Sequence, residues 1–404
     1  MNTINTQKIN REWIMLTLIM LITTDLLVVN IGGYPVVLMF ALLPWWLLKS
    51  FVIKKTVRVK LFLFYIGLIL IPFINIRDVS NWLEFWKSYS LLMMNAGILL
   101  FFCYSRAPRI NARTIGAFVR VAQNLILVFS LLQLFELYFI GTEYLWDLWG
   151  NWSSHFTISS WAKRAKAFYH EPSHLALITI FLFWMRFIVE RKLSLKNFLH
   201  CFIILALSRS GAGILIFPFI IGYIILSRYK FFIAIPLVIA FGLLLSVLIV
   251  QNQKTIYKLA KIDQLQDTES LSSGYMRWIL PVKIMKIHYN EGRFLGYGLG
   301  QLESDYFQKV DELMKSLDIK DSAIANGLLS AQIQFGLFFT LFILYAFIYR
   351  YPKMNKRWRS FVFINFICLT AGSYFLVEMY FIRFFIPLLL LKSIDEKVKM
   401  EQLP

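Results

Sequence analysis

Long apolar runs separated by short basic segments make up most of this sequence. Runs such as 13–31, 34–53, 115–140 and 323–349 each hold about the 20 residues that an α-helix needs to cross a hydrocarbon core of roughly 30 Å. Hydrophobic residues make up 58% of the chain and charged residues 16%, against roughly 25% charged residues in a soluble domain. The pattern therefore predicts an all-α polytopic membrane protein.

The basic residues concentrate between the apolar runs and set the predicted topology. Clusters within 54–60, 106–113, 191–196 and 350–359 lie at alternate ends of the runs, as expected for cytoplasmic loops. Counting crossings between clusters predicts about 12 transmembrane helices with both termini in the cytoplasm. The first run is expected to remain as a helix, because no small-residue cleavage site follows it. The formal net charge of +19 is thus explained by basic loops that face the cytoplasm and its anionic lipids. No nucleic-acid partner is expected.

Two longer polar segments are predicted to lie on the outer side of a single membrane domain that spans residues 1–404. Segment 141–171 is the first periplasmic loop, and its tryptophans fit either an interfacial aromatic belt or a surface that stacks on sugars. Segment 251–322 is the second and larger loop, predicted to form amphipathic helices. The two halves of the chain show no internal repeat, which argues against a transporter built on repeats.

Residues 198–226 form an apolar run with cations at both ends, so the chain should enter and leave the membrane by the same face. This predicts a hairpin of two short helices whose tip falls at 208–213, the sequence Ser-Arg-Ser-Gly-Ala-Gly. Arg209 would then lie within the membrane region. A charged residue there is costly and is by default a functional residue, with Ser208 and Ser210 as its polar neighbours.

The stretch 164–174, Arg-Ala-Lys-Ala-Phe-Tyr-His-Glu-Pro-Ser-His, contains the H-E-x-x-H pattern of zinc proteases. That motif needs both histidines on one continuous helix, but Pro172 disfavours a helical Glu171 and fits the first helical position. His170 would then lie outside the helix and His174 inside it, so we expect no metal. Glu171 either caps the helix or acts as a carboxylate that handles an acceptor proton.

Three guanidinium groups, on Arg164, Arg209 and Arg277, are predicted to lie on or near the outer leaflet. A guanidinium presents a planar fork of donors that matches phosphate oxygens. Three such groups would suit a diphosphate, although each residue on its own also fits lipid headgroup binding or a solvated loop.

Five sequence pieces, in order, carry a family resemblance. They are Phe-Tyr-His-Glu-Pro-Ser-His at 168–174 after Arg164, Leu-Ser-Arg-Ser-Gly at 207–211, Ser-Gly-Tyr-Met-Arg at 273–277, Gly-Tyr-Gly-Leu-Gly at 296–300, and Asn-Gly-Leu-Leu at 326–329 before Gln-Phe-Gly at 334–336. The set resembles the Wzy-type O-antigen polymerases and the related O-antigen ligases. The ligases usually carry a His before the Asn of the last piece, where this chain has Ala325, so the polymerase is the closer match.

The resemblance implies a C-superfamily-like glycosyltransferase in the bacterial plasma (inner) membrane, with its active site facing the periplasm. It would polymerise undecaprenyl-diphosphate-linked oligosaccharide units without a cofactor, alongside membrane lipid, a flippase and a chain-length regulator as partners. The expected residues are Arg164, Glu171, His174 and Arg277 for catalysis, Arg164, Arg209 and Arg277 for the diphosphate, and His170, Ser208, Ser210 and Asn326 for support. Glu171 and His174 both stay open as the base.

Two other functions fit parts of the pattern. A ligase would transfer the glycan to lipid A core and differs only in its acceptor. A flippase for lipid-linked oligosaccharides would move the substrate without lengthening it, but alternating access does not require an outer segment as long as 251–322.

Overall fold

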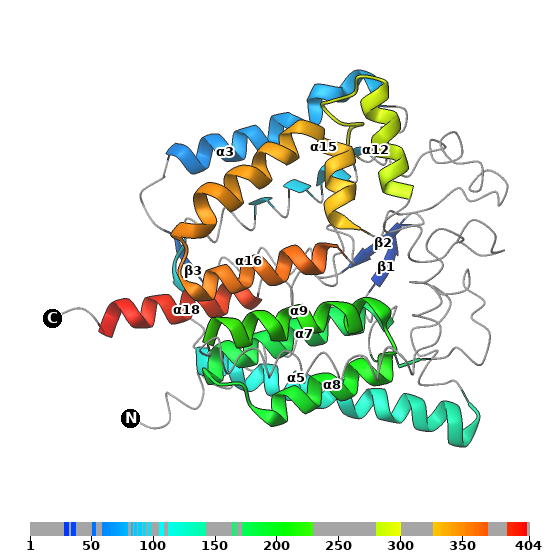
Figure 1. Cartoon of the computed structure of the whole chain (residues 1–404), viewed down its shortest axis with the longest axis vertical. Coiled ribbons are helices and arrows are strands. Elements are labelled where there is room, and N and C mark those ends of the chain that lie inside the picture. The colour runs from blue at the N-terminus through cyan, green and yellow to red at the C-terminus, as the bar shows by residue number, and fades with distance from the viewer. Residues whose placement is uncertain are drawn as a thin grey trace. The chain divides into compact units, whose positions relative to one another are not determined.

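The computed structural model describes residues 28–31, 34–37, 51–53, 59–79, most of 82–97, 105–108, 112–142, 164–165, 167, 172–228, 280–299, 326–370 and 386–401 (Figure 1). The chain divides into two compact units. The first comprises Met1–Val52, Arg106–Asn252 and Val377–Pro404, and the second comprises Ile53–Ser105 and Gln253–Leu376.

Two short antiparallel strands replace the ends of the first two expected helices. β1 (Val28–Ile31) pairs with β2 (Tyr34–Val37), with Val28 opposite Val37 and Ile31 opposite Tyr34. The prediction of helix over these residues is wrong. Valine, isoleucine and tyrosine favour strands, and the sequence between the strands, Gly32-Gly33, is a common two-residue hairpin connection. A second two-stranded sheet joins β3 (Phe51–Ile53) to β4 (Ser105–Pro108).

Four helices lie side by side in the first unit: α5 (Ala112–Phe135), α7 (Pro172–Glu190), α8 (Leu195–Ser208) and α9 (Gly211–Arg228) (Figure 1). α18 (Ile386–Glu401) also packs against α5. α7 is the central helix, since every residue from Leu175 to Ile188 is buried. It begins at Pro172, as predicted, because proline lacks the N–H that the first helical turn leaves unpaired.

Close approaches between helices fix their directions. A Cβ at Gly116 of α5 would lie 2.6 Å from Cγ1 of Val189, so the start of α5 meets the end of α7 and the two helices are antiparallel. A Cβ at Gly213 would lie 2.6 Å from Cβ of Ala176 and 2.9 Å from Cδ2 of Leu205. The start of α9 therefore meets the start of α7 and the end of α8.

The predicted hairpin within 198–226 is confirmed. α8 ends at Ser208, α9 begins at Gly211, and the turn contains Arg209 and Ser210. Farther from the turn, the ring of Phe217 in α9 lies 5.8 Å from that of Phe198 in α8. α8 begins at Leu195, earlier than the apolar run, which gives it about 21 Å of length at 1.5 Å per residue.

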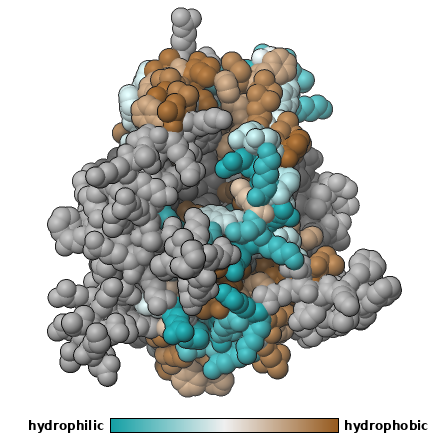
Figure 2. Space-filling view, turned by 90° about the vertical axis from the view of Figure 1, so that its left-hand side faces the viewer, coloured by the Kyte–Doolittle hydropathy of each residue, from teal (hydrophilic) through white to brown (hydrophobic). Residues whose placement is uncertain are grey.

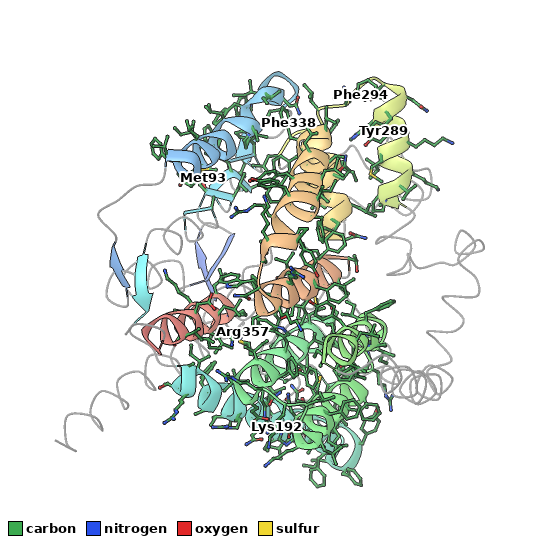
Figure 3. The ribbon with its side chains drawn as sticks, turned by 60° about the vertical axis from the view of Figure 1, so that its left-hand side comes forward. Met93, Lys192, Tyr289, Phe294, Phe338 and Arg357 are labelled. Carbon is green, nitrogen blue, oxygen red and sulfur yellow. The ribbon has the colours of Figure 1, made fainter. Side chains whose placement is uncertain are left out.

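The second unit contains α3 (Val59–Leu70), the 3₁₀ helix η2 (Ile71–Asp78), α12 (Leu280–Asn290), α15 (Gly327–Leu344) and α16 (Lys356–Leu369). α15 continues through a π-helical turn, η9 (Tyr345–Arg350), into η10 (Tyr351–Lys353). α12 fits the amphipathic helices expected in segment 251–322. Figure 3 shows Tyr289 in the last turn of α12 and Phe294 in the turn that follows this helix.

Three helical stretches among the described residues are long and apolar enough to cross a membrane: Ala112–Ile140, Pro172–Glu190 and Gly327–Lys353. The exposed side of the first carries Val121, Leu125, Val128, Leu132 and Phe135 at helical spacing. Figure 2 shows that hydrophobic residues also gather on the surface of the described part of the chain. The chain is therefore a helical membrane protein. Most of the other runs behind the predicted 12 helices, such as 231–250, lie outside the described residues.

Candidate functional site

The α8–α9 turn places Arg209 at one end of the first unit. Arg209 adopts φ 46° and ψ 33°, and its N–H donates to the carbonyl oxygens of Leu205 (3.1 Å) and Ala206 (3.3 Å). The side chain of Ser208 is buried and donates to the carbonyl oxygen of Leu205 (2.8 Å), while its Oγ accepts from the N–H of Ser210 (3.3 Å). Ser210 Oγ accepts from the N–H of Gly213 (3.4 Å), which caps α9. The two serines thus hold the backbone of the turn.

The segment before α7 lies against this turn. The N–H of Ala165 donates to the carbonyl oxygen of Leu207 (3.2 Å), and Arg164 Nη1 donates to the carbonyl oxygen of Arg209 (3.2 Å). The guanidinium of Arg164 is thereby held at the α8–α9 turn. We call Arg164, Ala165, Ala167, Ser208, Arg209 and Ser210 the corner cluster.

Gln133 of α5 fixes the same segment from the other side. Gln133 Nε2 donates to the carbonyl oxygen of Ala167 (3.0 Å), and the N–H of Ala167 donates to Gln133 Oε1 (2.8 Å). Both residues are completely buried.

Ala167 has φ 49° and Arg209 has φ 46°, a left-handed conformation that costs a residue other than glycine roughly 1–2 kcal/mol. Two such residues in one cluster are typical of functional sites.

The structure brings together some of the predicted site residues. Arg164, Ser208, Arg209 and Ser210 all belong to the corner cluster, and His174 lies in the first turn of α7, at the same end of the unit. His170, Glu171 and Arg277 lie outside the described residues. Asn326 belongs to the second unit. The Arg164 side chain is observed at the backbone of Arg209, and the shared diphosphate role of Arg164, Arg209 and Arg277 stays a prediction.

The side chain of Arg209 is exposed and forms no ion pair with any residue that the structure describes. The guanidinium of Arg164 donates to the backbone of this same residue, so positive charge at the α8–α9 turn is available to an anion from outside. The five N–H donors of a guanidinium match the oxygens of a phosphate group. No group of three His, Cys, Asp or Glu side chains gathers to hold a metal ion within the described ranges.

Two glycine motifs meet in the second unit. The N–H groups of Tyr297 and Gly298 donate to the carbonyl oxygens of Ile333 (2.8 Å) and Gln334 (3.2 Å), so the 296–300 motif lies along the 334–336 motif. Gly336 breaks α15 with φ 49° and ψ −127°, and Gly296 has φ 92°. A Cβ on either glycine would collide with the backbone of the other segment, so both positions require glycine.

Broken helices at membrane depth are tolerated where other groups satisfy the freed backbone. Here the N–H of Leu337 donates to the carbonyl oxygen of Phe294 (2.9 Å). Gln332 Nε2 donates to the carbonyl oxygen of Gly336 (3.1 Å), and Gln332 Oε1 accepts from the hydroxyl of Thr340 (2.9 Å). Asn75 Nδ2 donates to the carbonyl oxygens of Leu295 (3.3 Å) and Gly296 (3.1 Å). Hydrogen bonds from Gln332 and from the 294–296 segment thus stabilise the break in α15.

Asn326 caps α15. Its Oδ1 accepts from the N–H of Leu329 (3.1 Å), and the residue is completely buried. Its Nδ2 finds no hydrogen-bond acceptor in the part of the chain that the structure describes. The side-chain oxygen of Asn326 therefore has a structural role as a helix cap. Its side-chain N–H₂ group is a donor that can bind another acceptor.

His288 lies beside the 296–300 motif. Its ring stacks on that of Tyr297 with centroids 5.0 Å apart, and the guanidinium carbon of Arg293 lies 5.2 Å from the Tyr297 centroid. Burial, together with the positive charge of Arg293, lowers the pKa of His288 to about 4. The imidazole is therefore neutral at physiological pH.

A second polar group lies at the opposite end of the first unit. Arg186 of α7 is buried, its Nε lies 2.7 Å from Glu190 Oε1, and its Nη1 donates to Gln123 Oε1 (3.0 Å). Gln123 Nε2 donates to Asn197 Oδ1 (2.9 Å), and Asn197 Nδ2 donates to the carbonyl oxygen of Phe183 (3.0 Å). We call Gln123, Arg186, Glu190 and Asn197 the polar network. It joins α5, α7 and α8, which assigns these residues a structural role.

The sequence predictions missed Gln133, Glu136 and the polar network. Arg186, near the end of its apolar run, is buried and paired with Glu190. One signal was present in the sequence: Gln123, Ser130, Gln133 and Glu136 recur every three to seven residues within an otherwise apolar helix, and all four are buried. Such a polar stripe predicts a helix face packed inside the protein.

Comparison with models of known protein families, with curated proteins and with solved structures finds no match.

Proposed function

We propose that this chain polymerises undecaprenyl-diphosphate-linked oligosaccharide units at the outer face of the plasma membrane. The growing glycan is transferred from its lipid diphosphate to the non-reducing end of a new lipid-linked unit. The observation that carries the proposal is the corner cluster, in which Arg164 is held at the turn that presents Arg209, at one end of a membrane-spanning helix. The ordered motifs from 164 to 336 supply the resemblance to the polymerases.

The chemistry asks the protein to accept negative charge. When the glycosidic bond to the lipid diphosphate breaks, the bonding electrons go to the diphosphate oxygen. Guanidinium groups held in advance at that oxygen stabilise the transition state without having to reorganise. Two features supply such preorganisation, namely the Arg164 hydrogen bond to the turn and the Gln133 hydrogen bonds to Ala167. Arg277 is proposed as a third guanidinium.

The proposal is tested with purified protein and lipid-linked oligosaccharide units extracted from membranes of the source bacterium after deletion of this gene. A polymerase lengthens the units into a ladder on a gel. We expect Arg164→Ala and Arg209→Ala each to reduce the turnover by about 10²–10³, the typical effect of removing one preorganised donor. Lys192→Ala, which removes an exposed cation from the opposite end of α7 (Figure 3), serves as the matched control and should leave the ladder unchanged.

The other functions give different products in the same assay. A ligase would leave the lipid-linked units unpolymerised and transfer glycan only when lipid A core is added. A flippase would move the units across vesicle membranes without changing their length. A ladder that survives both arginine substitutions would refute the diphosphate role of the corner cluster.

A further inference from the structure

Glu136 is a buried carboxylate at the end of α5. It begins the π-helical turn η3 (Glu136–Ile140), lies within the apolar stretch Ala112–Ile140 and is 4% exposed. Its Oε1 accepts a hydrogen bond from the hydroxyl of Thr142 (2.9 Å), and its carbonyl oxygen accepts from the N–H of Gly141 (2.9 Å). An ionisable residue within a membrane span is costly and marks function by default, and π-helical turns occur frequently at functional sites.

Helix geometry places Glu136 at the same end of the first unit as the corner cluster. Glu136 follows Gln133 by three residues, so the two side chains share a face of α5 one turn apart. Gln133 is hydrogen-bonded to Ala167, and Ala167 lies three residues after Arg164.

The packing of α5 against α7 gives the same placement independently. Gly116 of α5 contacts Val189 at the end of α7, and the two helices are antiparallel. Measured from this contact at 1.5 Å per residue, Glu136 lies about 30 Å along α5, and Pro172 lies about 26 Å in the same direction along α7. Glu136, the first turn of α7 and the α8–α9 turn therefore lie at one level of the unit.

We propose that Glu136 is the general base of the transfer reaction, an inference that rests on the proposed polymerase function. The acceptor hydroxyl oxygen forms a bond to the anomeric carbon of the donor glycan, and the bond from that carbon to the diphosphate oxygen breaks. The hydroxyl proton passes to the carboxylate of Glu136, and the electron pair leaves with the diphosphate beside Arg164 and Arg209. Water then takes up the proton from Glu136.

The surroundings of Glu136 suit this role. A general base needs a fixed position and an ionised resting form. The hydrogen bond from Thr142 supplies the fixed position, because it orients the carboxylate. Among the described residues, no hydrogen bond or ion pair joins Glu136 to Arg164 or Arg209, so we expect the proposed diphosphate contacts to remain when Glu136 is substituted. Glu171 and His174 would then orient the acceptor.

The experiment separates proton transfer from binding. Glu136→Gln keeps the size of the side chain and an acceptor for Thr142 but removes the base. We expect its kcat for ladder formation to fall by about 10²–10⁴, the usual contribution of general base catalysis, while KM and the affinity for undecaprenyl diphosphate stay within twofold of the wild-type values. Arg164→Ala gives the contrasting pattern, with weakened binding of undecaprenyl diphosphate.

Control variants keep the inference falsifiable. Thr142→Val removes the orienting hydrogen bond and should lower kcat by about tenfold. If Glu136→Gln does not fold, Glu136→Asp carries the test, because it keeps the acid but displaces it and should lower kcat by about 10- to 100-fold. A variant whose kcat equals that of the wild type, or whose kcat, binding and melting temperature fall together, overturns the assignment. A wild-type protein that makes no ladder overturns the proposed function and this inference with it.

Discussion

The two hydrogen bonds between Gln133 and Ala167 give the most direct test of how the corner cluster is held. Gln133→Leu keeps the volume of the side chain and removes both bonds, so the buried N–H and carbonyl groups of Ala167 each lose a hydrogen-bond partner. The loss of its partner costs a buried polar group about 1–3 kcal/mol. Because Ala167 keeps a further interaction, we expect the lower part of the combined range for two groups, a loss of about 2–3 kcal/mol.

Thermal unfolding in detergent measures this loss. At roughly 2–4 °C per kcal/mol, the melting temperature should fall by about 4–12 °C. Asn124→Leu is the matched control, since it removes an amide from the adjacent, exposed position of α5 and should change stability by about 0.5 kcal/mol or less. Turnover should also fall by about 10- to 100-fold, because the preceding Arg164 loses its fixed position. A melting temperature and turnover that match those of the Asn124 variant would refute the idea that Gln133 holds the cluster.

Three further predictions follow from the packing and charge of the described residues. Gly213→Ala should destabilise the protein by about 1–3 kcal/mol through collision with Ala176, and adding Ala176→Gly should restore most of the loss in a double-mutant cycle of melting temperatures. Arg186→Met should cost about 1–3 kcal/mol, because Glu190 loses its partner at 2.7 Å and keeps only Arg120 at 3.9 Å, and the double variant with Glu190→Leu should be more stable than this single variant. Because the pKa of His288 is lowered to about 4 from an ordinary value of 6.5, the unfolded chain binds its proton first as the pH falls. Stability should therefore decline between about pH 6.5 and 4, by no more than about 3 kcal/mol, and His288→Phe should lose this part of the pH dependence of the melting temperature.

Local chemistry made several features predictable from the sequence. Cations at both ends of an apolar run predicted the α8–α9 hairpin, because a span with both ends on one side must turn. Pro172 predicted the start of α7, since its missing N–H is harmless only in the first turn. Both conclusions needed only neighbouring residues.

Other features depended on the tertiary structure. β1 and β2 lie in runs that are apolar throughout, where hydrophobicity alone cannot separate a strand from a helix. The partner of Gln133 is the backbone of Ala167, 34 residues later and in a segment without periodicity. The spacing of Arg186 and Glu190 was visible as an i, i+4 pair, but the burial of that pair depends on Asn197 and Gln123 from other helices.

The cations of the first unit distinguish its two ends. Arg113 at the start of α5, Arg191 and Lys192 after α7, and Lys196 at the start of α8 share the end that holds the polar network. By the positive-inside rule, we infer that this end faces the cytoplasm. Arg164 and Arg209 lie at the other end, where that rule gives no reason for positive charge. Because the carbonyl oxygen of Arg209 accepts from Arg164 and the turn adopts a left-handed conformation, these two residues are held in a defined geometry. We therefore propose that Arg164 and Arg209 are placed at this end to bind an anionic substrate, because the positive-inside rule does not explain them.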